Sequence, residues 1–67
     1  MEPKQYLSTW IYEDVRWWQV VHQGSAVCGA TVDKEHMVRL FKRKYPDADM
    51  LVWNGDIGKF VALEDIA

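Results

Sequence analysis

The residues that could perform chemistry are few, and their spacing forms no recognisable site. The 67-residue chain has one cysteine, Cys28, and two histidines, His22 and His36. A metal site or an activated nucleophile needs several such groups together, with partners that orient them. The two histidines are far apart in sequence, nothing orients a Cys28–histidine pair, and no glycine-rich phosphate loop is present. We therefore expect a protein without enzymatic activity, metal or cofactor.

Basic residues gather in one stretch, where five of the eight lysines and arginines fall between positions 34 and 44. A basic helix face can contact phosphates, which makes a nucleic-acid-binding domain the alternative function. The candidate phosphate-binding residues are Arg39, Lys42, Arg43 and Lys44. A solvated helix face is often charged, however, and Glu35 could pair with Arg39 four residues on. We therefore favour nucleic-acid binding less than protein binding.

Aromatic residues are plentiful, with four tryptophans, three tyrosines and two phenylalanines. Trp17 and Trp18 are adjacent, and neighbouring strand residues point to opposite faces of a sheet, so both cannot enter one core. If Glu13 pairs with Arg16 across a hairpin, one face carries Tyr6, Trp10, Tyr12 and Trp17. An exposed aromatic patch usually marks an interaction site. We expect these four residues to bind a protein partner or a second copy, unless a chain terminus covers Trp17.

The element with the clearest signal is a helix, expected over residues 34–45. Asp33 can cap its first turn, and Pro46 ends it because a proline disfavours helical backbone at the preceding residue. Apolar residues recur at helical spacing and form one stripe: Met37, Val38, Leu40, Phe41 and Tyr45. This stripe should pack on the sheet face opposite the aromatic patch, which carries Leu7, Ile11, Trp18 and Val20.

Four or five strands should accompany the helix. Strands are expected at residues 5–13, 17–23, 50–53 and 59–64. Residues 26–32 are either a short strand or an extended crossover, because Gly29 weakens a regular strand. Asn54-Gly55 is typical of a two-residue hairpin turn, whereas Gly58 favours a longer loop.

The order strand–strand–(strand)–helix–strand–strand predicts a single small α+β domain over residues 1–67. We expect one antiparallel sheet of four or five strands, with the helix packed on one face. The order resembles that of small bacterial and phage domains, so a phage- or prophage-encoded interaction module is one interpretation. The net charge of −2, the short apolar runs and the lack of a signal-peptide pattern favour a cytoplasmic protein without membrane contact. A homodimer is the simplest form of the interaction.

Overall fold

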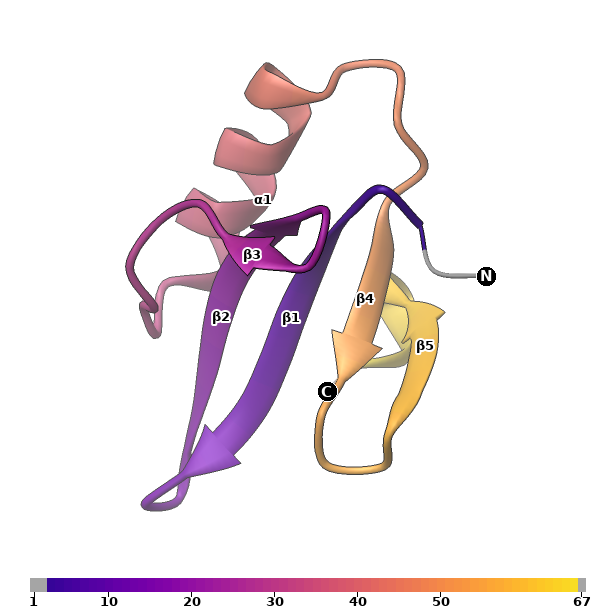
Figure 1. Ribbon diagram of the computed structural model, residues 1–67. Coiled ribbons are helices and arrows are strands. Elements are labelled where there is room, and N and C mark those ends of the chain that lie inside the picture. The colour runs from indigo at the N-terminus through magenta and orange to yellow at the C-terminus, as the bar shows by residue number, and fades with distance from the viewer. Residues whose placement is uncertain (1–2, 67) are drawn as a thin grey trace.

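The computed structural model describes residues 3–66, which form a five-stranded mixed sheet with one α-helix laid across one face (Figure 1). The elements are β1 (Gln5–Tyr12), β2 (Val15–His22), β3 (Ser25–Ala26), α1 (Lys34–Lys44), β4 (Leu51–Asn54), β5 (Lys59–Ala62) and the 3₁₀ helix η1 (Leu63–Asp65). The strand order is β3-β2-β1-β4-β5. The expected α+β class and element order are confirmed, and the expected helix differs from α1 by one residue.

One strand pairing departs from the expected antiparallel sheet. β1 and β4 pair in parallel, while every other pairing between the named strands is antiparallel. Parallel neighbours need a crossover connection, commonly a helix. Here α1 lies between β3 on one side of β1 and β4 on the other, so it serves as that crossover as well as the cover of the sheet. The sheet is therefore mixed.

The β1–β2 hairpin turns through two residues. Glu13 and Asp14 both have positive φ, at 52° and 66°, as a type I′ turn requires. Tyr12 therefore lies opposite Val15 and Trp10 opposite Trp17, so the expected pairing of Glu13 with Arg16 is wrong. The register differs by two residues. Because side chains alternate with a period of two, the expected division into faces still holds.

The β4–β5 hairpin uses the longer loop, with Asn54 opposite Lys59 and four residues between them. Gly58 supplies the positive φ, at 67°, so of the two alternatives left open by the sequence the longer loop forms, and not the two-residue turn at Asn54-Gly55. Gly55 serves a different purpose, because it lies against β1. Its N–H donates to the Thr9 carbonyl at 2.8 Å, and a Cβ at Gly55 would lie 3.2 Å from the same oxygen.

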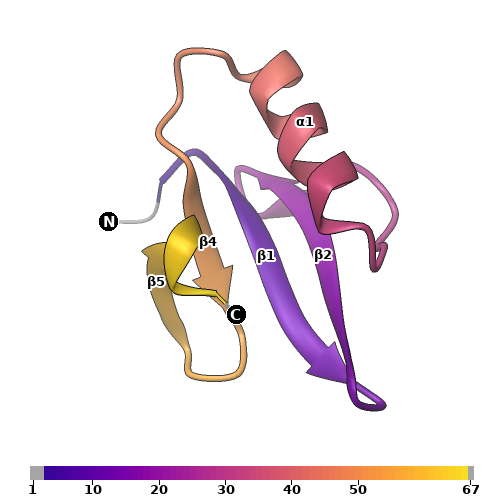
Figure 2. The same ribbon diagram turned by 180° about the vertical axis from the view of Figure 1, so that it is seen from behind.

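The hydrophobic core lies between α1 and the sheet (Figure 2). Its buried members are Leu7, Trp18, Val20, Met37, Phe41, Val52 and Ile66. Three of the four sheet residues expected to meet the helix are therefore confirmed. Ile11 is the exception, with 52% of its surface exposed, because it lies next to the hairpin turn at the end of β1 away from α1.

Asp33 caps α1 as expected, since its carboxylate accepts a hydrogen bond from the His36 N–H at 3.0 Å.

After β3 the chain runs extended, and Trp18 and Thr31 exchange two backbone hydrogen bonds. Residues 26–32 thus combine the end of a short strand with a crossover. At the other edge of the sheet, η1 lies over β4 and β5 on the same face as α1, and brings Ile66 into the core (Figure 2). No helix within residues 3–66 is long and apolar enough to cross a membrane.

Candidate interaction surface

The sheet face turned away from α1 gathers aromatic side chains from four strands. Trp10 lies opposite Trp17, and Trp53 lies beside Ser8 and opposite Phe60. Since directly paired residues share a face and alternate residues along a strand do too, these positions form one surface. We call it the aromatic face, made of Tyr6, Trp10, Tyr12, Trp17, Trp53 and Phe60. The structure thus brings together all four residues predicted from the sequence and adds Trp53 and Phe60.

Three of the six aromatic rings pack against one another. The Phe60 ring meets both Tyr6 and Trp53 edge-on, with ring centroids 5.0 Å apart in each pair. Gly55 lies next to Trp10 and Trp53. A Cβ added at Gly55 would be 3.5 Å from the Trp10 Cβ and 4.0 Å from the Trp53 Nε1. Edge-to-face pairs of this kind add to the stability that burial alone gives. Three of the six rings, those of Tyr6, Trp53 and Phe60, therefore form a packed cluster on the aromatic face.

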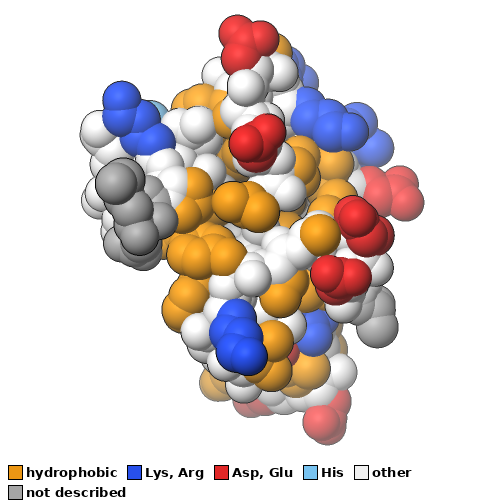
Figure 3. Space-filling model, turned by 90° about the vertical axis from the view of Figure 1, so that its right-hand side faces the viewer, with side chains coloured by type: hydrophobic (Ala, Val, Ile, Leu, Met, Phe, Trp, Pro, Cys, Tyr) orange, Lys and Arg blue, Asp and Glu red, His pale blue; other side chains and the backbone are white. Residues whose placement is uncertain are grey.

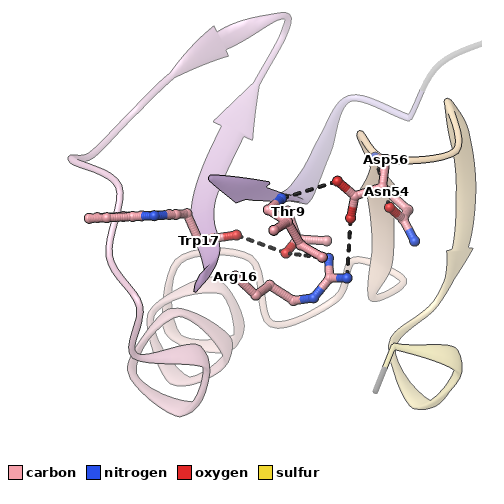
Figure 4. Close-up of polar contacts among 6 residues, drawn as sticks. Thr9, Arg16, Trp17, Asn54 and Asp56 are labelled. Atoms are coloured by element: carbon pink, nitrogen blue, oxygen red, sulfur yellow. Dashed lines mark hydrogen bonds and ion pairs between the residues drawn. The ribbon is translucent and has the colours of Figure 1, made fainter. Parts of the chain in front are cut away.

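The side chains of the aromatic face differ in their exposure to solvent. Tyr12, at the hairpin end, is 60% exposed, while Trp10, Trp17 and Trp53 are half-buried. The Trp17 Nε1 is buried without an acceptor among residues 3–66, and in Figure 4 the side chain points away from β1. Figure 3, which looks at the β5 edge, shows hydrophobic side chains in the middle of that edge and towards the side of the aromatic face. Apolar surface thus continues from the face onto this edge.

Charge is missing from the strand positions of this face. Besides the six aromatic residues, its members are Ser8, Val15, Gln19, Val21, Ala26, Leu51 and Ala62. None of these side chains is charged at neutral pH. Gln19 also fixes one border of the face, because its Nε2 donates to the Cys28 carbonyl at 2.8 Å. The surface is therefore aromatic, neutral and only lightly polar.

The predicted basic residues lie on the other side of the sheet. Arg39, Lys42, Arg43 and Lys44 are exposed on α1. Within the described chain the one ion pair is Arg16–Asp56, so Glu35 does not pair with Arg39 as the spacing allowed. α1 lies behind the aromatic face (Figures 1 and 2). The basic and the aromatic surfaces therefore do not face the same nucleic-acid strand.

Of the two histidines and the cysteine, His22 and Cys28 make packing contacts. The His22 ring stacks on Tyr45 with centroids 5.4 Å apart and planes 5° apart. The Cys28 Sγ lies 3.7 Å from the Met37 Sδ, next to the core, and His36 is exposed. Between residues 3 and 66 the structure contains no pocket and no group of three or more His, Cys, Asp or Glu side chains able to hold a metal ion.

A polar cluster joins the two hairpins at the end of the sheet away from α1 (Figure 4). Arg16 donates from Nη1 to the Thr9 hydroxyl at 3.2 Å and pairs from Nη2 with Asp56 at 3.2 Å. The buried Thr9 hydroxyl donates to the Trp17 carbonyl at 2.7 Å, and Asp56 accepts the Ile11 N–H at 3.1 Å. Each of these side chains bonds to another member of the cluster. We interpret it as a structural joint between β1 and the β4–β5 loop, which the sequence alone did not indicate.

Replacing Asp56 with alanine is expected to lower the free energy of unfolding by about 1–2 kcal/mol. The variant loses a half-exposed ion pair, worth up to about 1 kcal/mol, and the acceptor of the Ile11 N–H, worth about as much. Urea unfolding followed by circular dichroism measures the change. Asp47→Ala, in the exposed loop after α1, is the control and should change stability by less than about 0.5 kcal/mol. Equal stabilities for the two variants would contradict the joint.

Comparison with protein-family models, curated proteins and solved structures finds no match to this chain.

Proposed function

We propose that this chain is a small, non-enzymatic protein-interaction module that binds its partner through the aromatic face. The observation that carries the proposal is the gathering of six aromatic side chains on a neutral sheet face, with α1 and η1 both on the other side. Aromatic residues supply large contact areas at low entropic cost and dominate the energetics of protein interfaces.

The size of the face agrees with such a role. A strand residue covers about 16 Å² of sheet, from a rise of about 3.3 Å and a strand spacing of about 4.8 Å, so the five strands present about 400 Å². The largest apolar patch on a typical monomer is roughly 300–600 Å² and is often functional. The hydroxyls of Tyr12 and Ser8 add groups that can orient a partner.

Nucleic-acid binding by α1 is the second candidate, and one observation favours it. The four predicted phosphate-binding side chains are exposed, and none takes part in an ion pair within the described chain. Two facts weigh against it. The net charge of the chain is −2, and the aromatic face that could stack bases lies on the opposite side of the sheet.

A pull-down from lysate of the native host separates the two functions. The tagged parent is compared with Trp10→Ser/Trp17→Ser and with Arg39→Ser/Arg43→Ser, at several salt concentrations. We expect the aromatic double variant to lose the captured protein, and the basic double variant to keep it. Capture should depend little on salt, because apolar contacts, unlike phosphate contacts, release few counterions.

The fold of each variant is checked by the dispersion of its amide signals in NMR. The aromatic double variant should stay folded, because the core between α1 and the sheet is untouched. Capture of nucleic acid that is lost in the basic double variant and falls steeply with salt would replace the proposed function with the second candidate. An aromatic double variant that unfolds would show that Trp10 and Trp17 belong to the fold, and would contradict the proposal.

A further inference from the structure

We propose that the partner on the aromatic face is a second copy of this chain, packed face to face in a two-fold symmetric dimer. This inference rests on the proposed function and goes beyond it by naming the occupant. In a two-fold interface the same patch of both copies meets, so the patch must be compatible with itself. The charge, the side-chain sizes and the area of the face bear on this requirement.

The charge of the face suits self-association. A charged group near the two-fold axis would meet the same charge on its copy, and like charges in contact are strongly unfavourable. No strand residue of the aromatic face is charged, although the chain has eight basic and ten acidic residues. A strongly charged partner such as a nucleic acid finds nothing complementary here, whereas a second neutral face meets no repulsion.

The side-chain sizes also suit a sheet-on-sheet contact. Along β1 the small Ser8 stands between the large Tyr6 and Trp10, and across the sheet Ser8 lies between Gln19 and Trp53. Sheets that pack face to face lie about 10 Å apart, and their side chains interdigitate. Large rings of one copy can therefore pack over the small central residue of the other.

The area of the face favours a weak dimer. Two faces of about 400 Å² bury about 800 Å² together, below the roughly 1,200–2,000 Å² of stable specific complexes. We therefore infer a weak dimer with a dissociation constant in the micromolar range or above, which forms as concentration rises.

A charge-swap experiment tests the dimer. Ser8→Glu and Ser8→Lys each place one charge near the centre of the face, so each variant should dissociate at least about tenfold more easily than the parent. An equimolar mixture of the two variants should recover a one-to-one dimer, because opposite charges then meet. Sedimentation equilibrium over a range of protein concentrations measures the masses. Ser25→Glu and Ser25→Lys, at an exposed position of β3 on the other side of the sheet, are the controls and should behave as the parent.

The possible outcomes test the dimer, its face-to-face arrangement and the proposed function separately. A parent that stays monomeric at the highest concentration overturns the dimer. If host pull-down still depends on Trp10 and Trp17, the proposed function stands with an external partner. A dimer unaffected by charge at Ser8 overturns the face-to-face arrangement. If the Ser8 variants do not fold by NMR, Tyr12→Glu and Tyr12→Lys repeat the test at a 60% exposed position of the same face, with the same expected loss and recovery.

Discussion

Replacing Phe41 with alanine is expected to leave the protein largely unfolded. Phe41 is fully buried on the inner side of α1, and its ring meets Tyr45 with centroids 5.4 Å apart. Truncation of a buried phenylalanine costs about 3–5 kcal/mol, because transfer energy is lost and a cavity remains. A domain of this length has a total stability of only about 3–10 kcal/mol. The loss therefore removes much of the total, which a circular dichroism melt should show directly.

Arg43→Ala is the matched control on the same helix, two residues away. Arg43 is exposed, and it forms no ion pair within residues 3–66. Its replacement should change the free energy of unfolding by less than about 0.5 kcal/mol. A Phe41→Ala variant that melts as late as the Arg43→Ala control would mean that α1 does not pack on the sheet through this face.

The predictable parts of the fold are those marked by residues close together in the sequence. The helix follows from Asp33 at its start, Pro46 near its end and apolar residues at helical spacing between them. The division of β1 and β2 into two faces also follows from sequence, because adjacent Trp17 and Trp18 must point apart. This division is correct although the hairpin register differs by two residues, since an even shift keeps every side chain on its face.

The missed features depend on contacts between distant parts of the chain. The parallel pairing of β4 with β1 places Trp53 and Phe60 on the aromatic face, and no local pattern selects this pairing over an antiparallel one. Ile66 enters the core only because η1 turns it inward. The register of the β1–β2 hairpin was missed because Glu13 and Asp14 adopt positive φ without a glycine, so no residue marked the centre of the turn.

The parallel joint of β1 and β4 leads to a prediction about Gly55. We expect Gly55→Val to lower the free energy of unfolding by about 2–3 kcal/mol, in the upper part of the range for overpacked positions. The new Cβ would lie 3.2 Å from the Thr9 carbonyl oxygen and 3.5 Å from the Trp10 Cβ, and the branched methyl groups need still more room. β4 would have to move away from β1, which weakens the 2.8 Å hydrogen bond from the Gly55 N–H to Thr9. Urea unfolding measures the loss.

Two other glycines separate the possible causes of that loss. Gly58 has a φ of 67° and nothing within 4 Å of an added Cβ, so Gly58→Val should cost about 1–2 kcal/mol through backbone strain alone. Gly29 has neither a positive φ nor a close neighbour, and Gly29→Val should stay within about 0.5 kcal/mol of the parent. The expected order of stability is thus Gly29→Val, then Gly58→Val, then Gly55→Val. If Gly55→Val were as stable as Gly29→Val, the close approach of β4 to β1 at Thr9 would be wrong.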